Sequence, residues 1–76
     1  MAVTRINKDD MAAINAYMYL SGALVKREAG VWIIDTPEAT IIHENTEELL
    51  EDIKVNLACM KECVEPEMWE EAWNND

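Results

Sequence analysis

The chain has 76 residues, half of them apolar, and 16 acidic against six basic side chains give it a net charge of −10. This apolar fraction is too high for a disordered segment, so we expect a single small folded domain over residues 1–76. The negative charge repels nucleic acid and anionic membrane surfaces, so direct binding to either is not expected. A chain of this length is marginally stable by itself and usually relies on disulfides, a metal or a partner chain.

The first predicted element is a helix from about Lys8 to Glu28. Asn7 suits its N-cap, acidic residues occupy the first turn, and Gly30 follows the end as a stop signal. The apolar side of this helix carries Met11, Ile14, Tyr17, Met18, Leu20, Leu24 and Val25. The opposite side carries the small residues Ala12, Ala16, Gly22 and Ala23. A helix with two such faces is expected to be contacted on both sides.

A β-hairpin is predicted next, with strands at about 31–35 and 39–43. Both segments are short and rich in β-branched residues, and Pro37 between them suits a turn. In the alternative, Thr36 caps a helix that continues through Ile41 and Ile42. Because both faces of the hairpin are apolar and two strands alone are unstable, we expect a helix packed on it and room for a second hairpin at its edge.

A second helix is predicted from Asn45 or Thr46 to about Cys63. Glu48 lies three residues after Asn45, the spacing of a capping box. The apolar seam of this helix is narrow and consists of Leu49, Leu50, Ile53, Leu57, Met60 and Val64. Val55 is an exception, because it lies on the acidic face opposite the seam.

A short last helix is predicted over 66–74 and carries two of the three tryptophans. Pro66 breaks the preceding helix and suits the first position of a new one. Trp69 and Trp73 are four residues apart, so they share one face. They either cover a core that lacks phenylalanine or dock into a groove on another chain. The predicted fold is therefore α+β, in the order α-β-β-α-α, with the hairpin packed on helices.

Residues typical of catalytic or metal sites are few. Cys59 and Cys63 lie four apart on a helix, but a zinc site needs two more ligands, and nothing aligns His43 with them. We expect both cysteines to pack beside the apolar seam as small hydrophobes, and we predict no metal and no cofactor. One histidine, one serine and no glycine-rich loop offer little for an active site, so we predict that the protein is not an enzyme.

The negative charge is concentrated in the second half of the chain. Residues 44–76 contain eleven acids and two bases, a net charge of −9, against −1 for residues 1–43. The predicted partner-binding residues are the acids of the last two helices and the two tryptophans: Glu47, Glu48, Glu51, Asp52, Glu62, Glu65, Glu67, Glu70, Glu71, Trp69 and Trp73. Such rows of acids either solvate the surface or imitate phosphates and meet a basic surface of a nucleic-acid-binding protein.

In size, acidity and α+β make-up, the chain resembles the small inhibitors that bacteriophages encode, among them anti-CRISPR proteins and DNA mimics. The resemblance is one of class and involves no particular residue. It favours a small acidic inhibitor that occupies a basic surface of a nucleic-acid-handling host complex. The alternative is a regulatory or structural adaptor whose C-terminal helix docks an apolar groove on a partner.

We also predict a homodimer and a cytoplasmic location (the host cytoplasm if a phage encodes the protein). The first helix, the hairpin and the tail present more apolar surface than one short chain can cover. A twofold axis then pairs the hairpins edge to edge, or joins the first helices through Ala12, Ala16 and Ala23. The sequence shows no signal-peptide pattern, no apolar stretch long enough to span a membrane and no secreted disulfide pattern.

Overall fold

The computed structural model describes residues 6–74, which form three helices and a three-stranded antiparallel sheet in the order α-β-β-β-α-α. The elements are α1 (Lys8–Ser21), β1 (Leu24–Glu28), β2 (Val31–Asp35), β3 (Thr40–His43), α2 (Thr46–Cys63) and α3 (Pro66–Asn74). The predicted α+β class is confirmed, as are the hairpin formed by β2 and β3 and the two C-terminal helices. None of the helices within residues 6–74 is long and apolar enough to cross a membrane.

The first helix ends at Ser21, so the prediction that it extends to Glu28 is wrong. Gly22 follows it in the left-handed region at φ 75°, and its N–H donates to the Met18 carbonyl oxygen at 2.9 Å. This is the αL type of helix end that glycine favours. The chain then continues as β1, which the sequence analysis missed.

A two-residue turn joins β1 to β2. Its central residues, Ala29 and Gly30, both have positive φ angles, 52° and 82°. Glu28 and Val31 on either side of it are paired across the two strands. Two positive φ angles are the mark of a type I′ turn, whose twist matches that of the strands. The predicted hairpin is therefore extended by a third strand at its edge.

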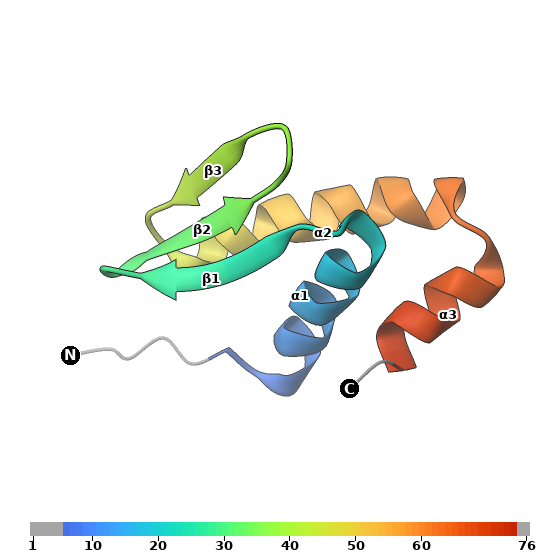
Figure 1. The fold of residues 1–76 in the computed structure, drawn as a ribbon. Coiled ribbons are helices and arrows are strands. Elements are labelled where there is room, and N and C mark those ends of the chain that lie inside the picture. The colour runs from blue at the N-terminus through green and yellow to red at the C-terminus, as the bar shows by residue number, and fades with distance from the viewer. Residues whose placement is uncertain (1–5, 75–76) are drawn as a thin grey trace.

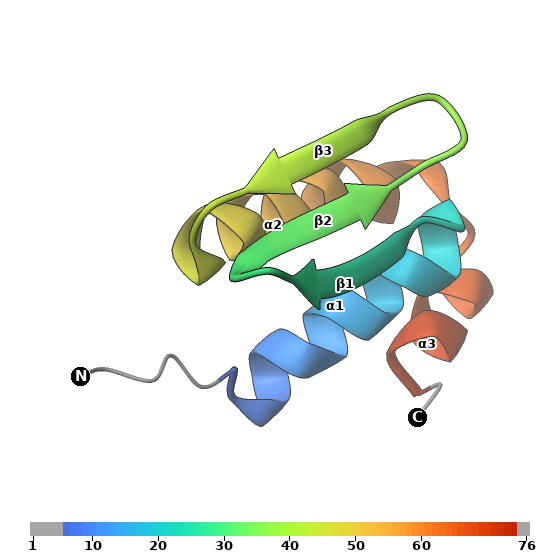
Figure 2. The same ribbon diagram turned by 60° about the vertical axis from the view of Figure 1, so that its left-hand side comes forward.

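The helices cover one face of the sheet, and no helix of residues 6–74 lies on the opposite face (Figure 1; Figure 2). On the covered face, Ile34 of the central strand β2 is 1% exposed. Trp32 lies two residues away on the same face, and its Nε1 donates to the Thr46 hydroxyl of α2 at 3.0 Å. The open face carries Ile33 of β2 paired with Ile42 of β3, which is 59% exposed. The sheet therefore has one covered side and one side with exposed apolar residues.

The core lies between the sheet, α1 and α2. The largest fully buried side chains are Ile14, Ile34, Leu49 and Ile53. Helix α1 packs against α2 and against α3, so both of its faces are in contact within one chain. Ala16 is 0% exposed and Ala23 is 5% exposed, so neither is available to a second copy. The predicted dimer interface through Ala12, Ala16 and Ala23 is therefore wrong, because two of these alanines are buried within the chain and only Ala12 is partly exposed.

Candidate partner-binding surface

Most of the predicted partner-binding acids lie on the exposed surface of α2 and α3. The exposed ones are Glu47, Glu48, Glu51, Glu62, Glu65, Glu67, Glu70 and Glu71. Asp52 differs from them, because its side chain is only 30% exposed and turns toward the sheet. Seven of these glutamates lie on α2 and α3 and Glu65 lies in the link between them, whereas Asp52 is not freely exposed.

The two lysines in this half of the chain do not pair with these glutamates. The Lys54 ammonium lies 3.1 Å from Oδ1 of Asp10 on α1, and the Lys61 ammonium lies over the Trp69 ring, 5.9 Å from its centroid. Within residues 6–74, no ion pair joins a lysine or arginine to the following glutamates: Glu47, Glu48, Glu51, Glu62, Glu65, Glu67, Glu70 and Glu71. These carboxylates consequently present a negative field that no ion pair with a lysine or arginine of residues 6–74 offsets.

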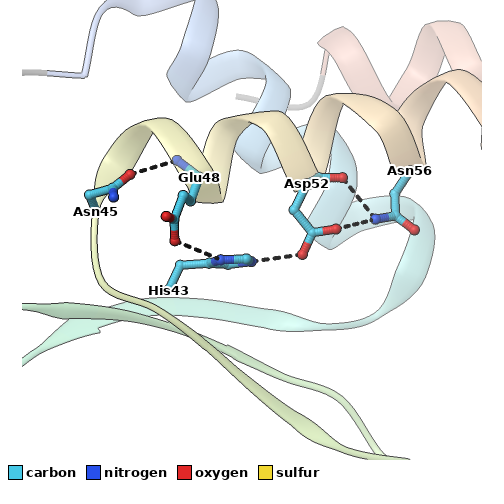
Figure 3. A network of polar contacts seen from close by, with 5 residues as sticks. All are labelled: His43, Asn45, Glu48, Asp52 and Asn56. Carbon is cyan, nitrogen blue, oxygen red and sulfur yellow. Dashed lines mark hydrogen bonds and ion pairs between the residues drawn. The ribbon is translucent and has the colours of Figure 1, made fainter.

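A polar network holds β3 against α2 (Figure 3). Nε2 of His43 lies 2.8 Å from Oδ2 of Asp52, and the Asn56 amide donates to both Oδ1 and the backbone oxygen of Asp52 at 2.8 Å each. The second ring nitrogen, Nδ1, lies 4.0 Å from Oε1 of Glu48. The backbone N–H of Glu48 donates to the Asn45 side chain, which caps α2. Asp52 and Glu48 thus serve to dock the edge strand on the helix.

The pKa values of the two tyrosines of α1, Tyr17 and Tyr19, are both raised. The Tyr19 hydroxyl donates to Oε1 of Glu71 on α3 at 2.6 Å, and this bond raises the pKa of Tyr19 above its ordinary value of 10.0. Burial raises the pKa of Tyr17, and the negative charge of Asp52 raises it further. Glu71 therefore links α3 to α1 in addition to contributing to the acidic surface.

Trp69 and Trp73 pack on the protein's own core from α3. Both are partly buried against the core cluster, and Ala72 between them is 1% exposed. The two ring centroids are 5.6 Å apart at an interplanar angle of 59°, a tilted aromatic pair. Nε1 of Trp73 is buried and has no hydrogen-bond partner among the described residues. Met68, at 50% exposure, is the apolar side chain of α3 that faces solvent.

The cysteines lie elsewhere than predicted. Cys59 and Cys63 are both exposed and free, so the prediction that they pack beside the seam is wrong. The buried residues of α2 are Thr46, Leu49, Ile53 and Leu57, and this narrow stripe includes neither cysteine. Between residues 6 and 74, no group of three or more His, Cys, Asp or Glu side chains is placed to hold a metal ion.

Two shallow hollows have lining residues of α2 in common. One has a volume of about 550 Å³ and is lined by Glu47, Leu50, Glu51, Lys54, Val55 and Ala58. The other has a volume of about 490 Å³ and is lined by Asp9, Asp10, Ala12, Ala13, Lys54, Leu57, Ala58 and Trp73. Lys54 and Ala58 line both of them; the first lies on α2 alone and the second between α1, α2 and α3. Sequence reasoning missed this feature; its one visible signal was Val55 on an acidic face.

No family model, curated protein or solved structure matches the chain. Function is therefore inferred from the charge, burial and contacts of the residues themselves.

Proposed function

We propose that the protein is a small acidic, non-enzymatic inhibitor that occupies a basic surface of a nucleic-acid-handling host complex in the cytoplasm. The observation that carries this proposal is the set of exposed glutamates on α2 and α3 that no lysine or arginine of residues 6–74 neutralises. Solubility alone requires only a modest net charge on a domain of this size. An uncompensated field of one sign accelerates encounter with a surface of opposite sign and orients the two partners.

The acidic row on α2 has the dimensions of a short nucleic-acid segment. Glu47, Glu51 and Glu62 are exposed on this one helix. At 1.5 Å per residue, the distance from the first to the last is about 22 Å along the axis. This is roughly the axial length of six base-pair steps at 3.4 Å each. A basic channel that normally accepts a phosphate backbone thus offers several cations to this row at once.

The experiment tests whether association with the partner depends on where the negative charges lie or only on the net charge. The variant carries Glu47→Lys, Glu51→Lys and Glu62→Lys, and the matched control carries Glu28→Lys, Asp35→Lys and Glu38→Lys. Both triple reversals change the net charge from −10 to −4. The partner is captured from a bacterial lysate and identified by mass spectrometry, and its association with each variant is then timed by stopped flow.

We expect the α2 variant to associate about tenfold more slowly and the control to stay within about twofold of wild type. Both should remain folded, because an exposed charge rarely contributes more than about 1 kcal/mol. Equal slowing in the two variants would show that only total charge matters. An unchanged rate in the α2 variant would refute the imitation of phosphates.

The adaptor hypothesis differs in that the C-terminal helix α3 docks in an apolar groove on the partner. Docking through Trp69 and Trp73 requires these rings to leave the core against which they pack, whereas Met68 is already exposed. Binding led by charge weakens steeply as ionic strength rises, and binding led by an apolar groove does not. A salt titration of the captured complex from 50 to 500 mM therefore distinguishes the inhibitor from the adaptor.

The proposal includes a homodimer formed by the sheet. The apolar surfaces that led to the dimer prediction include the open face of the sheet, which no helix of residues 6–74 covers. Leu24 is 54% exposed on this face and Ile42 is 59% exposed. Strand β3 is an edge strand without lysine, arginine, aspartate or glutamate, the type of edge that pairs with a second copy. Sedimentation at micromolar concentration should give a dimer that Ile42→Lys dissociates. A wild-type monomer of 8.7 kDa would disprove it.

A further inference from the structure

The two edges of the sheet differ in the charge that they carry. Strand β1 forms one edge and contains Lys26, Arg27 and Glu28. Strand β3 forms the other edge, Thr40–His43, and contains no lysine, arginine, aspartate or glutamate. Charged side chains on an edge strand oppose the addition of another strand. Strand addition is therefore open at β3 and opposed at β1, so it joins two copies and stops there.

The backbone groups of β3 that face the free edge are those of Thr40 and Ile42. The N–H of Thr36 donates to the Ala39 carbonyl oxygen at 2.9 Å, so these two residues face each other as a hydrogen-bonded pair just before the paired residues of β2 and β3 begin. Hydrogen-bonded and non-hydrogen-bonded pairs alternate along an antiparallel ladder. Thr40 and Ile42 are therefore in non-hydrogen-bonded pairs with β2. Their N–H and C=O groups consequently point to the free edge, where an added strand can bond to them.

One side of α2 lies toward this edge and carries two exposed thiols. The contact of His43 with Asp52 shows which side of the helix faces β3 (Figure 3). Three uncharged residues follow Asp52 on that side, at successive spacings of four, three and four: Asn56, Cys59 and Cys63. Both cysteines are exposed and free, although cysteine is among the residue types most often buried in proteins. We call these three residues, together with the free edge of β3, the β3 strip.

Charge indicates which partner the β3 strip fits. The strip has no lysine, arginine, aspartate or glutamate, whereas a basic partner is drawn to the exposed glutamates elsewhere on α2 and α3. Two chains that each carry a net charge of −10 repel each other, and the repulsion is weakest where uncharged surfaces meet. The strip therefore fits a second copy of this chain better than it fits the basic partner.

We infer that two copies join through the β3 strip, with β3 antiparallel to its own copy and with Cys59 and Cys63 covered at the interface. This inference rests on the homodimer of the proposed function, and it adds the strand register and the side of α2. About a twofold axis, Thr40 pairs with Ile42 of the second copy, and Ile41 lies opposite its own copy. Ile41 is 39% exposed in one chain, and this pairing covers it. Four strand residues are far fewer than the roughly 20–30 residues a side of a standard interface, so the dimer needs the side of α2 as well.

The experiment measures the reactivity of the two thiols together with the oligomeric state. The full-length protein is alkylated with N-ethylmaleimide over a series of protein concentrations, mass spectrometry times the modification of each cysteine, and sedimentation gives the oligomeric state. The control chain carries Cys59→Ser, Cys63→Ser and Ala58→Cys, because Ala58 is exposed and lines the hollow toward α1 and α3. Two variants then change one backbone donor: Thr40→Pro removes the N–H that points to the free edge, and Thr40→Val keeps it.

Alkylation of Cys59 and Cys63 should slow by at least about tenfold as the protein passes from monomer to dimer, and alkylation of the control cysteine should change by less than about twofold. Thr40→Pro should sediment as a monomer with fully reactive thiols, and Thr40→Val should behave as wild type.

A dimer whose thiols stay as reactive as the control cysteine would overturn the inference and leave the sheet dimer standing. A dimer with protected thiols in Thr40→Pro would overturn the strand register. If Thr40→Pro does not fold, as judged by circular dichroism, the thiol measurement on the wild type decides by itself. A wild-type monomer at every concentration would overturn this inference and the homodimer together. Charge-led binding of the basic partner is judged separately, by the association rates of the charge-reversal variants.

Discussion

Replacing Trp69 by alanine tests whether the tail helix is part of the core. A fully buried tryptophan removes about 150–250 Å² from water, and Trp69 is partly buried, so about 100 Å² is at stake. At about 25 cal/mol per Å², this area corresponds to roughly 2.5 kcal/mol. The tilted pair with Trp73 at 5.6 Å adds about 0.5–1.5 kcal/mol. Trp69→Ala should therefore lower the free energy of unfolding by about 3 kcal/mol.

Urea denaturation followed by circular dichroism measures this loss directly. For a domain of 76 residues, with a total stability of about 4–11 kcal/mol, the change is large. The same loss lowers the melting temperature by roughly 12–24 °C. Met68→Ala on the same helix is the control and should cost less than about 1 kcal/mol, because Met68 is 50% exposed. A cost below about 1 kcal/mol for Trp69→Ala would show that α3 does not stabilise the fold and would favour the adaptor.

Three further outcomes follow from single contacts. Trp73→Phe removes a buried N–H that has no partner among the described residues, so its free energy of unfolding should stay within about 1 kcal/mol of wild type. Trp32→Phe loses the hydrogen bond to Thr46 of α2 and should cost about 1–3 kcal/mol, as measured by urea denaturation. Ala29→Asn should raise the unfolding free energy by up to about 1 kcal/mol, since asparagine tolerates the φ of 52° better than alanine. The hydrogen bond to Glu71 favours the neutral form of Tyr19 and raises its pKa. The stability that this bond contributes is therefore complete below about pH 10 and is lost as the pH rises through the raised pKa. Urea midpoints measured from pH 8 to 11 should fall less in Tyr19→Phe than in wild type.

The second half of the fold could be predicted because its signals are local. Asn45 caps α2 through a side-chain bond to the N–H of Glu48, as the capping spacing indicates. Pro66 begins α3, where its missing N–H has no cost. The apolar seam of α2 has the period of a helix over four turns, and its central residues are buried. Each of these features depends on neighbours within a few positions of the chain.

Strand β1 was not predictable in the same way, because its signals conflict. Leu24 and Val25 fit the apolar side of a continuing helix as well as they fit a strand. Gly22 is compatible with a helix face of small residues, and only its left-handed φ shows that it ends α1. The turn at Ala29 uses a residue that rarely adopts positive φ, so the usual Asn-Gly signal of a type I′ turn is missing. Pairing with β2 is what decides in favour of the strand.

The candidate site shows the same division between composition and contacts. Composition gives the number of acids, but it does not say which of them are used inside the fold. Asp10 holds Lys54, and Asp52 meets His43, so these two carboxylates act as internal links. Lys54 of α2 is ion-paired with Asp10 of α1 and not with a glutamate of its own helix. The exposed face of α2 therefore carries glutamates that are not ion-paired with this lysine, and Val55 lies exposed among them.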